Sequence, residues 1–129
     1  MAKIMIVEDS PHQQEFLRAA LRADGHDIVA ASDGGDAIRR LEAERFDLIL
    51  TDIFMPDCDG LELIRRIRAS DSSLPIIAMS AGAQGPLFLR VARQFGADAT
   101  LDKASLPSEI AVAVAGVLAD QFAAKISEA

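Results

Sequence analysis

The chain has 129 residues, half of them apolar, which is enough to bury one sizeable core, so a single domain is the default expectation. Its 20 acidic side chains outnumber the 13 lysines and arginines, and the net charge of −7 argues against binding to nucleic acid or to an anionic membrane surface. The single cysteine excludes an internal disulfide, and the sequence offers neither a secretory leader nor an apolar run near the roughly 20 residues of a membrane span, so we expect a cytoplasmic protein.

Five short apolar runs rich in β-formers alternate with five segments of helical spacing. In chain order, the runs are residues 4–7, 28–31, 48–51, 75–79 and, more weakly, 99–101. The helical segments are marked by apolar residues within 16–21, 37–41, 63–67, 87–95 and 110–118. Strict alternation predicts a doubly wound α/β fold, with a mostly parallel sheet and helices on both faces.

Helix-boundary signals agree with this division. Start signals are Ser10-Pro11 with Gln13, and Asp59 with Glu62, while Gly25 and Gly96 are suited to helix C-termini. We find no repeat and no linker to a second domain. The sequence therefore predicts one domain over residues 1–122, with residues 123–129 as a C-terminal tail or an extension of the last helix.

Chemically active side chains follow four of the five predicted strands. They are Glu8, Asp9 and Ser10 after the first run, Asp52 after the third, Ser80 and Ala81 after the fourth, and Asp102 and Lys103 after the fifth. Ligands of open parallel sheets bind beyond the carboxyl ends of the strands, so this fold would bring these groups together.

Three carboxylates at one place predict a metal site. Glu8, Asp9 and Asp52 would repel one another unless a cation neutralised them, and oxygen ligands suit a hard divalent ion such as Mg²⁺, with Mn²⁺ as the alternative. Asp52 directly follows a buried run, which favours a fixed nucleophile that attacks a phosphoryl group. Lys103 could balance the charge that develops, and the Ser80 hydroxyl could donate to the bound phosphoryl group and so report its presence.

These residues resemble the receiver domains of two-component response regulators, of which the single-domain chemotaxis regulator is the familiar example. The resemblance covers nearly the whole chain and rests on Glu8-Asp9, the segment from Thr51 to Pro56 with Asp59-Gly60, Ser80-Ala81, Gly96-Ala97-Asp98 and Lys103. It implies a flavodoxin-like (βα)5 fold with strand order 2-1-3-4-5. Asp52 would be the phosphoacceptor, and Asp9, Asp52 and the Phe54 backbone carbonyl would bind Mg²⁺, with Glu8 acting mainly through water.

The resemblance also implies partners. The phosphoryl donor would be a phosphohistidine on a sensor histidine kinase or a phosphotransfer protein. A target protein would read the change at Ser80 and the fourth helix in trans, and the chain would be a monomer or a phosphorylation-dependent dimer. We expect self-phosphorylation and slow autodephosphorylation, but no turnover of an external substrate.

Two positions depart from the family pattern. Ala104 follows the lysine where receivers usually have proline, often with a cis peptide bond, and a non-proline cis bond would cost about 3 kcal/mol. This places the geometry of Lys103 in question. Thr100 stands where many receivers have the Tyr or Phe that turns inward on activation, so an aromatic switch at that position is excluded.

Other readings stay open beside this one. The departures leave room for a receiver-like module that binds its partner without phosphate, in which Asp52→Asn would leave binding unchanged. An aspartyl phosphatase fits poorly because Asp52 follows the third strand and not the first. A flavin protein fits poorly because Glu8 and Asp9 would repel the flavin phosphate. His12 and Cys58 are assigned no role.

Overall fold

The computed structural model of the chain describes residues 1–55, 60–71 and 73–128. Its strands are β1 (Lys3–Val7), β2 (Asp27–Ala31), β3 (Leu48–Asp52), β4 (Ile76–Ser80) and β5 (Ala99–Asp102). Its α-helices are α1 (Pro11–Arg22), α2 (Gly34–Ala43), α3 (Gly60–Ser70), α4 (Gly85–Phe95) and α5 (Leu106–Glu128), and a short 3-10 helix, η1 (Lys103–Ser105), precedes α5.

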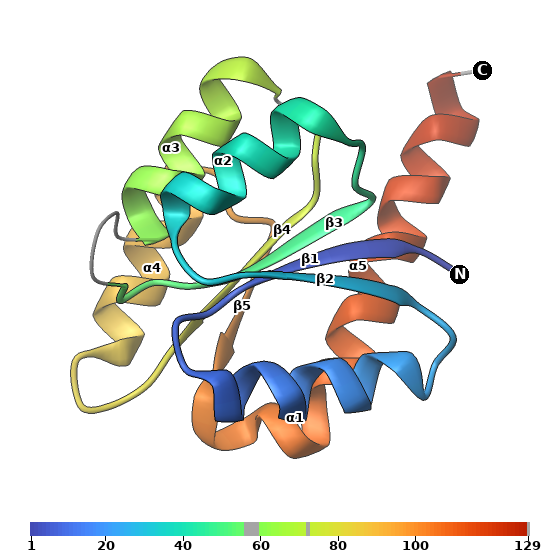
Figure 1. Ribbon diagram of the computed structural model, residues 1–129. Helices are drawn as coiled ribbons and strands as arrows, with labels where there is room; N and C mark the ends of the chain where they lie inside the picture. The colour runs from blue at the N-terminus through green and yellow to red at the C-terminus, as the bar shows by residue number, and fades with distance from the viewer. Residues whose placement is uncertain (56–59, 72, 129) are drawn as a thin grey trace.

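The strands form one parallel sheet in the order β2-β1-β3-β4-β5 (Figure 1). The chain begins near the middle of the sheet, adds β2 on one side, and then crosses β1 to add β3, β4 and β5 on the other. Parallel neighbours need crossover connections, and each crossover here contains a helix. The predicted doubly wound, flavodoxin-like fold and its strand order are confirmed.

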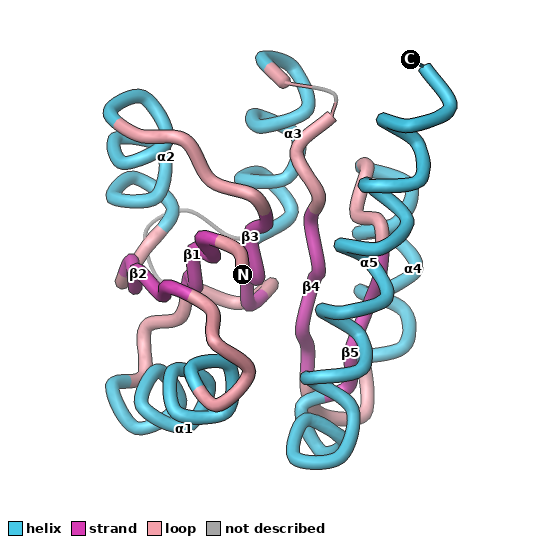
Figure 2. The backbone as a smooth tube through the Cα atoms, turned by 90° about the vertical axis from the view of Figure 1, so that its right-hand side faces the viewer, coloured by secondary structure: helices cyan, strands magenta, loops and turns pink. Residues whose placement is uncertain are grey.

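Helices cover both faces of the sheet (Figures 1 and 2). Each face has its own apolar cluster. On one face, α2, α3 and α4 contribute Ala37, Ile64 and Ala92. On the other face, α1 and α5 contribute Leu17 and Ile110. Because the central strands are buried on both sides, β3 and β4 contain no exposed residue, which explains their continuous apolar runs.

Three strands, β3, β4 and β5, run one residue further at their carboxyl ends than the apolar runs indicated, while β1 and β2 end where predicted. Asp52 pairs with Met79 in the ladder between β3 and β4, and Ser80 pairs with Asp102 in the ladder between β4 and β5. The backbones of Asp52 and Ser80 are therefore fixed by hydrogen bonds of the sheet, so their side chains project from strands and not from loops. Polarity hid these positions from the apolar pattern, although backbone pairing does not depend on it.

Helix ends follow the predicted signals where the structure describes them. The Ser10 hydroxyl accepts a hydrogen bond from the Gln13 backbone N–H at 3.3 Å, as an N-cap does. Gly96 follows α4 with φ of +122°, and Gly25 lies beyond α1 with φ of +85°, both in the left-handed region that favours glycine. The predicted start signal at Asp59 lies outside the described residues.

The last helix, α5, continues past residue 122. Leu106, Ile110 and Val114 of α5 are buried against the sheet, and the helix continues to Glu128. The stretch Lys103–Ala123, which includes η1 and most of α5, contains an 18-residue window with a mean hydropathy of 1.3 and is long and apolar enough to cross a membrane by length and composition alone. The sequence analysis considered unbroken apolar runs and so did not single out this alanine-rich helix, and length and composition alone do not show that it crosses a membrane.

Arg68 ties three segments together near the amino ends of β4 and β5. Its guanidinium donates to the backbone carbonyls of Gly96 at 2.9 Å and Leu74 at 2.6 Å, and to the carboxylate of Asp98 at 2.8 Å. Asp98 Oδ2 also accepts the Ile76 N–H at 2.8 Å. The acidic residue of the Gly96-Ala97-Asp98 motif therefore fixes the turn between α4 and β5.

Candidate functional site

Three carboxylates meet at the carboxyl edge of the sheet. Glu8 and Asp9 follow β1, and Asp52 ends β3, the strand beside it. Ligand oxygens of the three residues all lie within 4.8 Å of one another. Glu8 is 2% exposed and Asp52 is 5% exposed, whereas Asp9 is open to solvent. The structure therefore brings together the acidic residues that the sequence analysis selected.

Lys103 reaches the same place from the end of β5. Its Nζ lies 2.8 Å from Asp52 Oδ2 and 3.2 Å from Glu8 Oε2. Two buried carboxylates thus share one ammonium group, while the third, Asp9, forms no hydrogen bond or ion pair with another side chain of the described residues. Counting charges, three carboxylates and one ammonium leave the site at about −2 when all four are ionised.

Burial and charge repulsion act most strongly on Glu8. Its pKa is raised from 4.5 to about 7, first because burial disfavours the charged form and then because Asp52 lies beside it, although Lys103 partly opposes this. Burial works to lower the pKa of the Lys103 ammonium, but its bonds to Asp52 and Glu8 outweigh burial and raise it. Lys103 therefore stays charged at neutral pH, and the carboxyl of Glu8 is poised to take up or release a proton.

Ser80 places an unused hydroxyl beside this cluster. The residue ends β4, next to β3, and is 1% exposed. Its Oγ has no hydrogen-bond partner among the described residues. A buried hydroxyl without a partner is unfavourable by roughly 1–3 kcal/mol, so such a group at a site calls for an explanation in terms of a ligand.

Phe54 connects the acidic cluster to its surroundings. Its backbone N–H donates to Asp52 Oδ1 at 3.3 Å, and its ring meets Phe88 of α4 edge to face, with centroids 4.7 Å apart and planes at 82°. The sequence analysis assigned Phe54 only its backbone carbonyl and did not mention Phe88 as part of the site. The spacing of apolar residues along the chain gives no sign that Phe54 and Phe88, which lie 34 positions apart, would be in contact.

Close contact with the backbone at the end of β3 explains why residue 60 of the Asp59-Gly60 motif is a glycine. A Cβ at this position would lie 2.1 Å from the Asp52 carbonyl oxygen and 2.6 Å from the Ile53 Cα. The Gly60 N–H also donates to the Ile53 carbonyl at 2.6 Å. The first turn of α3 therefore rests directly on the backbone of the phosphoacceptor candidate. Asp59, Pro56 and Cys58 lie outside the described residues.

The two departures from the family pattern leave Lys103 in place. The described residues contain no cis peptide bond, and η1 follows Lys103 directly, with Asp102 Oδ1 accepting the Ala104 N–H at 2.9 Å. This capping role takes Asp102 away from the acidic cluster. Thr100 lies within β5 and is only partly buried.

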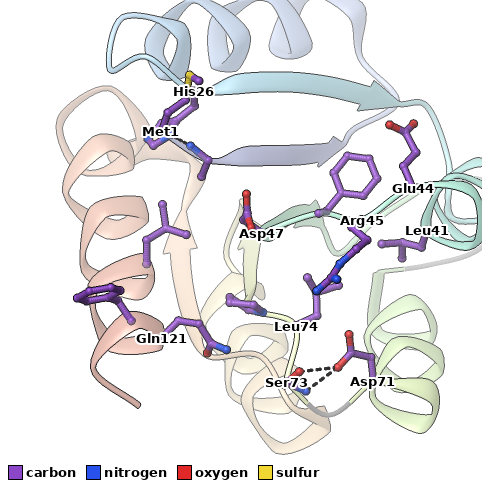
Figure 3. A pocket seen from close by; sticks show the side chains of 15 residues that line it. Met1, His26, Leu41, Glu44, Arg45, Asp47, Asp71, Ser73, Leu74 and Gln121 are labelled. Atoms are coloured by element: carbon purple, nitrogen blue, oxygen red, sulfur yellow. Dashed lines mark hydrogen bonds between the residues drawn. The ribbon is translucent and has the colours of Figure 1, made fainter. Parts of the chain in front are cut away.

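A separate cavity of about 530 Å³ opens at the other edge of the sheet (Figure 3). Several of its polar groups already have partners within the protein. Asp71 accepts from the backbone and hydroxyl of Ser73, and His26 Nδ1 accepts the Ala2 N–H at 3.1 Å. None of the residues of the acidic cluster lines this cavity, so the chemistry is concentrated at the carboxyl edge.

The donor set of the acidic cluster fits a hard divalent cation. It offers carboxylate oxygens from three residues, two of them buried and within reach of one another, and no nitrogen or sulfur ligand. Mg²⁺ and Mn²⁺ prefer such oxygen ligands, and the solvent-facing Asp9 leaves room for the waters that Mg²⁺ retains. Such an acidic cluster is typical of the magnesium site of receiver domains.

Comparison with known proteins agrees with the geometry. Residues 4–115 match the model of the family described as response regulator receiver domain. The chain is 40% identical over 81 residues to the sensor protein EvgS of Escherichia coli strain K12, which covers 63% of this chain and 7% of that protein. It is 32% identical over 128 residues to the alkaline phosphatase synthesis transcriptional regulatory protein PhoP of Bacillus subtilis strain 168, which covers 98% of this chain and 52% of PhoP.

A solved structure has the same fold and a ligand of interest. The response regulator TrrA of Thermotoga maritima, in complex with Mg²⁺-BeF, superposes with a TM-score of 0.82 at 26% identity, over 91% of this chain and 99% of that chain. The chain spans about half or less of the curated relatives named above. Fold, acidic cluster and family match together show that this chain belongs to the response regulator receiver domains, which are phosphorylatable switches of two-component signalling and not enzymes that turn over a separate substrate.

Proposed function

We propose that Asp52 accepts a phosphoryl group from a phosphohistidine of a sensor histidine kinase or phosphotransfer protein. The observation that carries this proposal is the buried Asp52 carboxylate at the tip of β3, 2.8 Å from the Lys103 ammonium and beside two further carboxylates. An Asp52 oxygen forms a bond to phosphorus as the phosphorus–nitrogen bond of the donor breaks. The electron pair stays on the departing imidazole, which then takes up a proton.

Asp9, Asp52 and the Phe54 carbonyl would hold Mg²⁺ directly, and Glu8 would act mainly through water. When bound, the metal supplies positive charge against the oxygens of the transferred group. Lys103 supplies positive charge from the protein itself. The −2 charge of the metal-free cluster supports this division, because one divalent ion brings it to neutrality.

The Ser80 hydroxyl donates to the phosphoryl group once it is attached. Its burial and lack of a partner in the unphosphorylated protein support this role, since the new acceptor would satisfy a donor that is otherwise unused. Ser80 stands at the end of β4, and α4 begins five residues later at Gly85. A shift of Ser80 toward Asp52 therefore alters the segment that leads into α4, and a partner protein reads that change.

The proposed setting is a cytoplasmic signalling pathway in which residues 1–122 form the receiver and act on a target protein in trans. This is the manner of the single-domain chemotaxis regulators. The protein would be a monomer or a phosphorylation-dependent dimer. The competing function is a module that binds its partner without phosphate, and Asp52→Asn distinguishes the two, because only the phosphate-independent module retains partner binding unchanged.

Intact-mass measurement tests the central step. The chain is incubated with Mg²⁺ and acetyl phosphate, beside Asp52→Asn and a sample with excess chelator. We expect one phosphoryl adduct that requires both Asp52 and Mg²⁺. If no adduct forms and beryllofluoride also fails to bind, the phosphorylation proposal is wrong and the phosphate-independent module takes its place.

A further inference from the structure

We infer that the contact between Phe54 and Phe88 positions Phe54, two residues after the end of β3, for metal binding and joins it to α4. Phe88 is then a positioning residue for the Asp52 site, although it lies on a different element and contributes no ligand. The inference rests on the proposed function, because it concerns the metal site at Asp52.

The contact itself is specific. The two rings meet edge to face at 4.7 Å and 82°, the geometry in which the positive edge of one ring faces the negative face of the other. Phe54 is 49% exposed, so little else fixes its ring, while Phe88 packs partly into the core beside α3 and β4. The ring of Phe88 is thus the anchored partner, and the ring of Phe54 is the one that it holds.

Phe54 is also tied to the phosphoacceptor through its backbone. Its N–H donates to Asp52 Oδ1 at 3.3 Å, and its carbonyl, on the same residue, is the proposed metal ligand. Three functions therefore depend on the backbone angles of one residue: the bond to Asp52, the direction of the carbonyl and the position of the ring. Fixing the ring on Phe88 restricts those angles and keeps the residue in one arrangement.

Phe88, the other residue of the contact, lies at the end of α4 that is close to Ser80. Phe88 is in the first turn of α4, which begins at Gly85, and a Cβ at Gly85 would lie 3.7 Å from Ser80 Oγ. The start of α4 thus lies beside Ser80 at Gly85 and contacts Phe54 through Phe88. Both groups that sense the state of Asp52 converge on the same turn of one helix.

The energetic consequence has a definite sign. Without the ring contact, the segment after β3 spends less time in the metal-competent arrangement, and the apparent Kd for Mg²⁺ rises by the inverse of the fraction that remains competent. An aromatic pair of this geometry contributes enough to shift such a population by about three- to tenfold. Binding of Mg²⁺ should in turn favour the contact, because coupling between two events is reciprocal.

A double-mutant cycle tests the inference. Phe54→Leu, Phe88→Leu and the double variant are compared with the wild type by Mg²⁺ titration followed through backbone amide NMR signals, since the chain has no Trp or Tyr to report by fluorescence. We expect each single variant to weaken Mg²⁺ binding about three- to tenfold. The double variant should bind no more weakly than the weaker single variant, because the contact is already lost. Beryllofluoride should also shift the amide signals of α4 less in each variant.

Matched controls separate positioning from general damage. Phe95→Leu changes an exposed ring at the far end of the same helix and should leave the Kd unchanged. Phe88→Tyr keeps the ring and should restore wild-type binding, while thermal unfolding shows which variants remain folded. Unchanged Mg²⁺ affinity in folded Phe54→Leu and Phe88→Leu, or effects of the two that simply multiply, overturns the inference alone. Absence of Mg²⁺ binding in the wild type overturns the proposed metal site and this inference with it.

Discussion

Lys103 Nζ lies 2.8 Å from Asp52 Oδ2, so the group that would contact an incoming phosphoryl oxygen is already paired with the group that would attack phosphorus. The same ammonium lies 3.2 Å from Glu8 Oε2. In the metal-free protein Lys103 therefore occupies the place of a counter-ion, and a divalent cation must compete with it for the two buried carboxylates.

Replacing Lys103 should separate metal binding from phosphoryl transfer. In Lys103→Ala the cluster loses one positive charge, so we expect Mg²⁺ to bind several-fold more tightly and phosphorylation by acetyl phosphate to slow about a hundredfold or more. Titration followed by NMR and intact-mass time courses measure the two quantities. Lys3→Ala, which changes a lysine at the other edge of the sheet, is the control. Weaker Mg²⁺ binding in Lys103→Ala would count against competition between the two cations.

Glu8 should make the stability of the metal-free protein depend on pH. Its folded-state pKa of about 7 exceeds the ordinary 4.5, so between these values the folded protein holds a proton that the unfolded chain has lost. The free energy of unfolding therefore decreases as pH rises from about 4.5 through 7, by on the order of 3 kcal/mol at this residue. Urea unfolding with chelator at pH 5 and 8 measures the slope, and Glu8→Gln should lack this part of it. Equal slopes in the two proteins would refute the assignment to Glu8.

Magnesium binding should release a proton near neutral pH. A cation favours the ionised form of Glu8, so we expect Mg²⁺ affinity to increase with pH up to about 7 and to level off above it. Calorimetry at pH 6.5 in buffers of different ionisation enthalpy gives the number of protons released. A value of zero, with affinity independent of pH, would mean that Glu8 does not sense the metal.

Gly60 should tolerate no side chain. A Cβ 2.1 Å from the Asp52 carbonyl oxygen forces α3 away from β3, so Gly60→Ala should lower the free energy of unfolding by about 3 kcal/mol or more and impair phosphorylation of Asp52. Gly116→Ala is the matched control, because Gly116 lies on the exposed side of α5 and nothing lies within 4 Å of a new Cβ. That variant should be stabilised by up to about 1 kcal/mol. Urea unfolding compares them, and equal stability of the two variants would contradict the close approach.

Removal of Arg68 should loosen the amino edge without altering the acidic cluster. Arg68→Ala leaves the carbonyls of Gly96 and Leu74 and the carboxylate of Asp98 without this donor, so a loss of about 2–3 kcal/mol in unfolding free energy is expected. Arg66→Ala, on the exposed side of the same helix, should change stability by less than about 0.5 kcal/mol. Mg²⁺ affinity should stay at the wild-type value in both, and a large change in Arg68→Ala would show that the two edges are coupled.

The sequence was sufficient to predict the fold and the acidic cluster because both depend on local patterns. Alternation of apolar runs and helical spacing determines a parallel sheet, and the parallel arrangement places every strand end at one edge, which brings Asp52, Glu8 and Lys103 together. The carboxyl ends of β3, β4 and β5 were predicted one residue short because Asp52, Ser80 and Asp102 are polar and yet paired in the sheet.

What the sequence could not show are contacts between elements that have no common local pattern. The edge-to-face geometry of Phe54 and Phe88, and the bonds from Arg68 to Gly96 and Asp98, depend on how neighbouring elements pack. An isolated arginine on a helix is normally a solvent-exposed charge, and the three partners Leu74, Gly96 and Asp98 lie 6 to 30 positions away. Only the folded structure shows that Arg68 holds several segments together.

The bond from Arg68 to Gly96 restrains one end of α4. Arg68 holds the carbonyl of Gly96 at the end of the helix, whereas the first turn of α4 faces Ser80 and Phe54. The helix has 11 residues and is about 16 Å long. A displacement of its first turn would therefore rotate the helix about its held end near Gly96. A displacement of about 2 Å at Gly85 then becomes a tilt of about 7° and not a translation. If Asp52 is phosphorylated as proposed, a partner protein would recognise the angle of α4, and the change would be greatest at the end of the helix nearest Asp52.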